Sequence, residues 1–261
     1  MRDQANNKRI TKRRLRQTAV ILSAAALLAV GGIMAYFTDT DMRENVVTVG
    51  SVKVQLDEGD NYVDSQTAVP GTVIEKAPKL TNKGNNNEYV FLKVEVPKEN
   101  VTLLYEKSDD PDNEGKIKLE KSRQQIFKLI ADGTGTAAVP AAEGKDVVFD
   151  YHGNTETSDG WVLLTEKCDF TGTAKDVYVF GYSRMLTPVG DTSSTKTLFD
   201  KVQLKSIIDG EIPGSTAEKI TVTGYAIQDR NLDVEGLSAD TDPTAEQLTA
   251  IYGIVERKKQ Q

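Results

Sequence analysis

The residue best suited to acid–base or metal chemistry is the single histidine, His152, and its sequence neighbours give it no recognisable partner. The chain has no HExxH pattern, so the commonest helical zinc-protease site is absent. A zinc site on His152 would need carboxylates from elsewhere, which the sequence leaves open. The single cysteine, Cys168, and the serines lie in no recognisable nucleophile motif. We therefore expect no catalytic, cofactor-binding or metal-binding residues, and we expect His152 to be an exposed loop residue.

An acidic stretch over residues 108–115 superficially resembles a calcium-binding loop. Its potential ligands are Asp110, Asp112 and Glu114, followed by Gly115. An EF-hand loop needs a carboxylate eleven residues after the first ligand, and that position here is Lys121. A solvated turn is the better interpretation of this stretch.

The first 35 residues have the pattern of an export signal. Residues 1–17 hold seven basic residues and one acid, and residues 18–35 form an apolar run. The Gly31–Gly32 pair would break a helix just before the small residue Ala35. We expect cleavage between Ala35 and Tyr36, which limits membrane contact to the time before cleavage. A retained anchor is the alternative, because about 18 residues barely span a bilayer.

The rest of the chain is acidic, which excludes some classes of function. The net charge is −7 overall, so subtracting the +6 of residues 1–17 leaves −13. A nucleic-acid partner would require a basic face, so we expect none. One cysteine cannot form an internal disulfide, and the roughly 226 residues after the signal suffice for a single large β-sandwich.

The mature chain begins with a β pattern. Val47, Val49, Val52 and Val54 alternate along a predicted strand over 46–56, with a phase slip at Gly50–Ser51. Trp161 is predicted to anchor the core. Further strands are predicted at 72–74, 88–96 (ended by Pro97), 147–149, 161–164, 177–182, 197–204 and 220–228.

Two parts of the chain depart from this pattern. Residues 105–160 contain an irregular insertion, in which residues 119–130 permit a helix that Gly133–Gly135 would end. Residues 238–261 form a tail with an amphipathic helix, capped by Asp242 with Pro243 at its first position. We expect this helix to pack on the sandwich, the alternative being a docking site for a partner. Its apolar stripe is Ala245, Leu248, Ile251, Tyr252 and Val255.

Several of these segments together resemble one family. The export stretch GGIMAYFTDTD, the following NVVTVGSVKVQL and the later VPG and YVFLKV are similar to the TasA/camelysin family. That family comprises secreted surface and matrix proteins of Gram-positive bacteria, processed by a SipW-type signal peptidase. The strands around Trp161 and over 177–228 extend the resemblance, which does not cover residues 105–150. It implies an all-β, jelly-roll-like two-sheet antiparallel sandwich over 36–237, with a short C-terminal helix and an irregular insertion.

The resemblance also implies a function. We expect a secreted structural subunit of a biofilm matrix or cell-surface fibre, which self-associates by exchanging its N-terminal strand through Val47, Val49, Val52 and Val54. Its expected partners are further copies, the signal peptidase during export and an accessory matrix subunit, with no cofactor. Two alternatives stay open. One is a camelysin-like surface metallopeptidase, although we do not expect an enzyme. The other is a monomeric surface adhesin that binds a ligand through residues 105–160.

Overall fold

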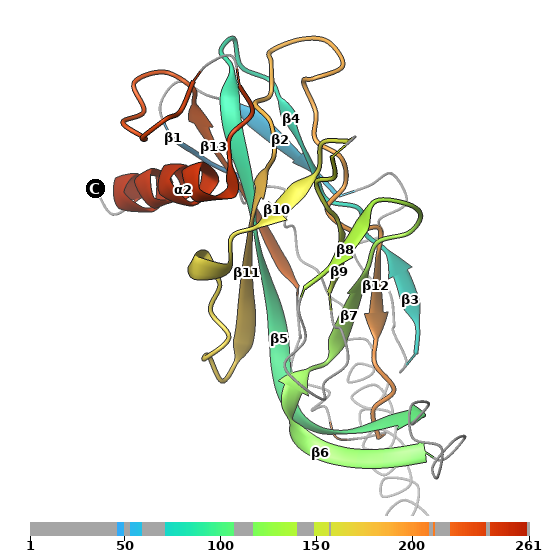
Figure 1. Ribbon diagram of the computed structural model, residues 1–261. Coiled ribbons are helices and arrows are strands. Elements are labelled where there is room, and N and C mark those ends of the chain that lie inside the picture. Colours follow the sequence, from blue (N-terminus) through green and yellow to red (C-terminus); the bar gives the residue numbers. More distant parts are fainter. Residues whose placement is uncertain are drawn as a thin grey trace, which may run out of the picture.

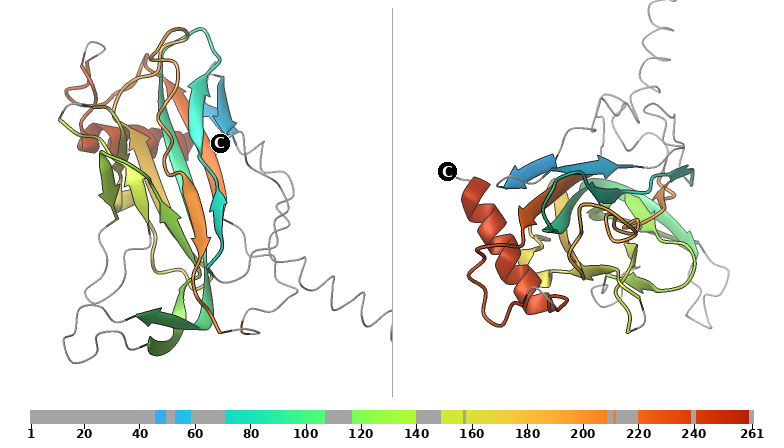
Figure 2. Two further views of the ribbon diagram at one scale, coloured as in Figure 1. Left: turned by 90° about the vertical axis from the view of Figure 1, so that its right-hand side faces the viewer. Right: turned by 90° about the horizontal axis from the view of Figure 1, so that it is seen from above.

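The chain folds into two layers of β-sheet with one long helix on the outside (Figure 1). The computed structural model describes residues 46–49, 53–58, 71–106, 117–139, 149–156, 158–208, 211, 220–238 and 241–259. Viewed from above, the helix lies outside the ring of strands (Figure 2). Within these ranges no helix is long and apolar enough to cross a membrane.

The larger sheet is built around the long strand β5. Every pair in it is antiparallel except the edge strand β1, which runs parallel to β13. Its spatial order is β1 (Val46–Val49), β13 (Thr221–Gln228), β5 (Glu88–Glu106), β11 (Lys175–Tyr182) and β10 (Trp161–Leu163), and β6 (Ile117–Gln125) pairs with the far half of β5.

Smaller ribbons make up the opposing layer and the rim. They are β3 (Val73–Glu75) with β12 (Lys201–Leu204) and β7 (Phe127–Ile130), β2 (Val54–Asp57) with β4 (Lys79–Asn82), and β8 (Thr136–Ala138) with β9 (Asp150–His152). A 3-10 turn, η2 (Thr165–Lys167), precedes β11, and the helix α2 (Ala245–Lys259) ends the fold. This arrangement confirms the predicted all-β sandwich.

Alternation along β5 separates two hydrophobic clusters. Val90 and Leu92 point between the layers, whereas Tyr89 and Phe91 point towards α2. All four side chains are buried, and each buried side chain of this size stabilises the fold by about 1.5–3 kcal/mol. Trp161 is 1% exposed and donates from Nε1 to the Lys196 carbonyl at 3.1 Å, which confirms it as a core anchor.

Pro97 does not end its strand, contrary to the prediction, and β5 continues to Glu106. The Lys98 N–H donates to Ala174 O at 2.8 Å, on the β11 side. Because the hydrogen-bonding direction alternates along a strand, the Pro97 nitrogen faces the β13 side, where pairing already stops at Glu95. The missing N–H therefore costs no sheet hydrogen bond, and β5 bends there towards β6.

The segment 105–160 is more regular than predicted. Its described residues contribute β6, β7, β8 and β9, and no helix forms over 119–130. Phe127 and Leu129 alternate inward from β7 into the main core, a period of two that the helical interpretation overlooked. The acidic stretch 108–115 lies outside the described residues. The described residues of this segment are thus part of the sandwich.

The C-terminal helix packs on the larger sheet as expected, but its cap is two residues later than predicted. Thr244 Oγ1 accepts from the Gln247 N–H at 3.3 Å, and Gln247 Oε1 accepts from the Thr244 N–H at 2.9 Å. This reciprocal pair is a capping box, so Thr244 rather than Asp242 begins the helix. Ala245 is exposed, and the rest of the predicted stripe is buried: Leu248, Ile251, Tyr252 and Val255.

Residues 46–56 form two strands rather than one. β1 pairs with β13 at the edge of the larger sheet, and β2 pairs with β4 across the sandwich. The predicted change of phase at Gly50–Ser51 thus falls between two strands that belong to different sheets. Val52 lies outside the described residues.

Candidate functional site

His152 is a half-buried residue of β9, not the exposed loop residue predicted. Its Nε2 lies 2.7 Å from Asp200 Oδ2. Thr197 Oγ1 donates to Asp200 Oδ1 at 2.9 Å, and the Asp132 N–H donates to Asp200 Oδ2 at 2.8 Å. Burial acts to raise the pKa of Asp200, but hydrogen bonds from the Asp132 N–H, His152 and Thr197 lower it overall. The pair is held in a fixed geometry.

Among the described residues, this pair has neither a nucleophile nor a set of metal ligands beside it. In the described part of the chain, no serine or cysteine forms a hydrogen bond with the His152 side chain, so no nucleophile is paired with this base. Cys168 Sγ donates to the Leu164 carbonyl at 3.4 Å, and burial raises the pKa of its thiol, which disfavours the reactive thiolate. Among the residues that the structure describes, no three His, Cys, Asp or Glu side chains could hold a metal ion. The described residues therefore do not fit a zinc site.

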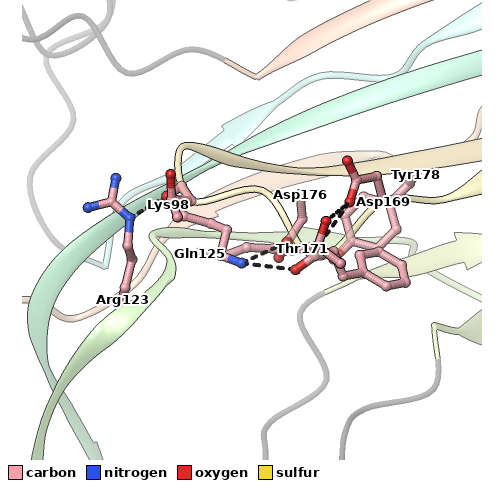
Figure 3. Close-up of polar contacts among 9 residues, drawn as sticks. Lys98, Arg123, Gln125, Asp169, Thr171, Asp176 and Tyr178 are labelled. Carbon is pink, nitrogen blue, oxygen red and sulfur yellow. Dashed lines mark hydrogen bonds and ion pairs between the residues drawn. The ribbon is translucent and has the colours of Figure 1, made fainter.

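A second polar cluster joins three strands at the bend of β5 (Figure 3). Asp176 of β11 accepts from Lys98 Nζ at 2.9 Å and from Gln125 Nε2 at 2.7 Å. Gln125 also contacts the Tyr178 hydroxyl. Burial raises the pKa of Tyr178, so the phenol stays neutral. Lys98 and Gln125 are register partners on β5 and β6, so Asp176 ties both strands of the hairpin to the larger sheet.

The loop before β11 closes the same cluster. Asp169 Oδ1 accepts from the Thr171 N–H at 2.9 Å and from Thr171 Oγ1 at 2.6 Å. Arg123 Nε donates to the Thr173 carbonyl, and the Phe170 ring lies 5.1 Å from that of Tyr178. These contacts fix the β5–β6 hairpin, although Gln125 Oε1 is buried without a hydrogen-bond partner. Among the described residues, the carboxylates and the phenol of the cluster are all engaged in hydrogen bonds. Sequence reasoning missed the cluster because the partners lie 50 to 78 residues apart.

The structure divides the predicted subunit-joining residues between two sheets. Val47 pairs with Tyr225 and Val49 with Ile227, in the β1–β13 ladder. Val54 is buried in β2, opposite Asn82. Ala35 and Tyr36, the predicted cleavage residues, lie outside the described residues.

Two features set β1 apart. It is four residues long, and in the described part of the chain its only strand partner is β13. The ladder begins opposite Gly224, where a Cβ would lie 2.7 Å from a methyl group of Leu80 on β4. Glycine therefore lets the β2–β4 ribbon lie close to β13 beside β1.

Comparison with known proteins gives one match. Residues 11–120 match the family model described as camelysin metallo-endopeptidase. This range includes residues 11–35 of the predicted export segment, β1 to β5 and the start of β6, and it confirms the resemblance drawn from the sequence. No curated protein and no solved structure matches the chain.

Proposed function

Because residues 11–120 match the camelysin family model, we propose that the chain is a secreted structural subunit of a bacterial extracellular matrix or cell-surface fibre. The observation that carries the proposal is the position of β1, a short edge strand at the end of the sheet and near the start of the mature chain. The signal peptidase releases Tyr36 as the first residue. Copies of the chain, with an accessory matrix subunit, are its partners outside the cell.

Assembly proceeds by exchange of β1. A strand of four residues with a single strand neighbour loses few hydrogen bonds when it leaves, and its departure exposes the outer edge of β13. The β1 of a second copy restores the same four rungs, so the two states have nearly the same contacts. Each subunit gives one strand and receives one, and such a head-to-tail contact extends into a filament.

The residues after β1 supply the connection. Gly50 and Ser51 separate β1 from β2, and β2 stays anchored by four register pairs with β4. Exchange therefore needs movement of β1 and its connection alone. In this mechanism Val47 and Val49 join the subunits, whereas Val54 holds the donor to its own sandwich.

The test is assembly of the mature chain, residues 36–261. Scattering and electron microscopy should show filaments for the intact mature chain and monomers for a chain starting at Gly50 or carrying Val49→Lys. Val73→Lys, at a 46%-exposed position on β3, is the matched control and should still form filaments. If all variants form the same species as the intact chain, β1 is not the joint.

A surface metallopeptidase is a second candidate, because the matched family is described as a metallo-endopeptidase. The described donors do not fit a zinc site, so ligands would have to come from other parts of the chain. Peptide cleavage by the purified protein that stops on chelation and returns with zinc would establish this function.

A further inference from the structure

Glu88, the first residue of β5, is a buried carboxyl with no role in the sites above. Its side chain is 0% exposed, and neither carboxyl oxygen has a hydrogen-bond partner among the described residues. Because alternate residues of a strand point to the same face, Glu88 points with Val90 and Leu92 between the two layers. A carboxyl group in such surroundings is far less costly neutral than charged.

The neighbours of Glu88 are committed to other contacts. The Glu88 N–H donates to Leu186 O at 3.0 Å, and the Leu186 N–H donates to Glu88 O at 2.9 Å. Asn82 Nδ2 donates to the same Leu186 carbonyl at 3.2 Å and to Asn86 O at 2.9 Å. Asn82 Oδ1 accepts from the Gly84 N–H at 2.8 Å. The Asn82 amide therefore cannot turn to Glu88 without losing these hydrogen bonds.

Among the described residues, no charged group on the surrounding elements forms a hydrogen bond with the Glu88 carboxyl. Asp229 follows Gln228, the register partner of Glu88 on β13. Lys53 and Lys83 lie at the end of the β2–β4 ribbon, where the Lys83 N–H donates to Lys53 O. Arg184, two residues before Leu186, pairs with Asp159 at 3.0 Å. Burial alone raises the pKa of Glu88, to about 8.

Glu88 also lies close in register to the end of β1 and the start of β2. β1 ends at Val49 opposite Ile227, one residue before the Gln228–Glu88 pair. β2 begins at Val54 opposite Asn82, whose side chain shares the Leu186 carbonyl with the Glu88 N–H. Both strands that flank residues 50–53 thus end beside the neighbours of Glu88. A charge on this carboxyl would act beside the register pairs that hold the end of β1 and the start of β2.

We propose that Glu88 is a proton-dependent latch on the N-terminal strands. The neutral carboxyl is compatible with the closed state, in which β1 pairs with β13 beside the Gln228–Glu88 pair. Loss of its proton favours the state in which β1 has left β13. This inference rests on the proposed strand exchange for its biological use, but the latch itself is a property of the monomer.

The direction of the pH effect follows from proton linkage. The carboxyl binds its proton more tightly in the closed state than in the open or unfolded state, so closure is favoured at low pH. Between about pH 5 and 8 the closed state loses up to about tenfold in population per pH unit relative to the open state. Above about pH 8 the effect levels off, because the carboxyl is then ionised in both states.

The experiment measures opening of β1 in the mature monomer by amide hydrogen exchange from pH 5 to 9, corrected for the intrinsic rate. Opening should increase with pH in the wild type and be nearly independent of pH in Glu88→Gln. Glu95→Gln is the matched control on the same strand. Its carboxylate already pairs with Lys93 at 2.7 Å, so the wild-type pH dependence should remain. If Glu88→Gln does not fold, the pH dependence of β1 opening is measured in Glu88→Met instead, and it should likewise be nearly absent.

An unchanged pH dependence in the Glu88 variant, or equal loss of it in Glu95→Gln, would overturn the latch. Assembly separates this inference from the proposed function. If Glu88→Gln removes the pH dependence of β1 opening but no filament forms at any pH, strand exchange fails while the latch stands. If filaments form, but Glu88→Gln changes neither the pH dependence of their growth rate nor that of β1 opening, the latch is contradicted and strand exchange is not.

Discussion

Lys98 Nζ lies 2.9 Å from Asp176 Oδ1, and this contact ties the bend of β5 to β11. Both side chains are largely shielded, at 16% and 13% exposure, so the pair is less screened than a surface ion pair. Gln125 approaches the second oxygen of Asp176 from β6. One carboxylate therefore positions two strands.

Replacing Asp176 should destabilise the fold measurably. Asp176→Ala removes the carboxylate that Lys98 and Gln125 share, and we expect a loss of about 1–3 kcal/mol of unfolding free energy. The control is Lys79→Ala, which removes an ion pair to Asp57 with side chains 40% and 36% exposed and should cost less than about 1 kcal/mol. Urea unfolding of both variants checks this, and equal losses would mean that the cluster has no special role.

His152 should matter for stability but not for export or assembly. His152→Ala removes one hydrogen bond to Asp200, so we expect a loss of about 1 kcal/mol and unchanged secretion and filament formation. Quantification of secreted protein together with urea unfolding tests this. A variant that folds and is secreted normally but no longer cleaves a peptide that the wild type cleaves would reveal a missed active site.

Asp200 gives a pH dependence opposite in sign to that of Glu88. Its pKa is lowered in the fold, so its contribution to stability is present above about pH 4 and is lost as the pH falls through the folded pKa. Asp200→Asn should therefore be less stable than the wild type at pH 7, with a difference that shrinks in acid. Unfolding curves between pH 2 and 7 measure this difference, and a gap that stays constant would contradict the assignment.

The contact between α2 and the larger sheet should be among the strongest single contributions. Leu248 is fully buried, and Leu248→Ala should cost about 2–5 kcal/mol. Thr244→Ala removes the cap and should cost about 0.5–2 kcal/mol, whereas Asp242→Ala, at the cap predicted from sequence, should be nearly neutral. Thermal unfolding of the three variants would contradict the observed helix start if Asp242→Ala were the more harmful change.

Processing should leave Tyr36 as the first residue. The expectation comes from the Gly31–Gly32 pair and the small Ala35 after an apolar run. N-terminal sequencing of the secreted protein measures this directly. A start at Met1, or more than a few residues from Tyr36, would contradict it.

Strands could be predicted where apolar and polar residues alternate within one short stretch that turn residues bound. Val90 to Val96 and Val222 to Ile227 show their strands directly, and the helical spacing of Leu248 to Val255 shows α2. Pro97 misled the prediction because only the neighbouring strands determine whether its missing N–H matters. The Lys98–Asp176 contact and the isolation of Glu88 depend on residues far apart in the chain, which no local pattern contains.

The most direct test of strand exchange is a disulfide across the β1–β13 ladder. Thr48 and Ala226 are register partners, so Thr48→Cys with Ala226→Cys, in a Cys168→Ser background, places two thiols at a distance suited to bonding. Oxidised filaments should give a ladder of covalent multimers on a denaturing gel, and the Thr48→Cys single variant should give no ladder. Filaments in which the two cysteines join only within one chain would contradict the account.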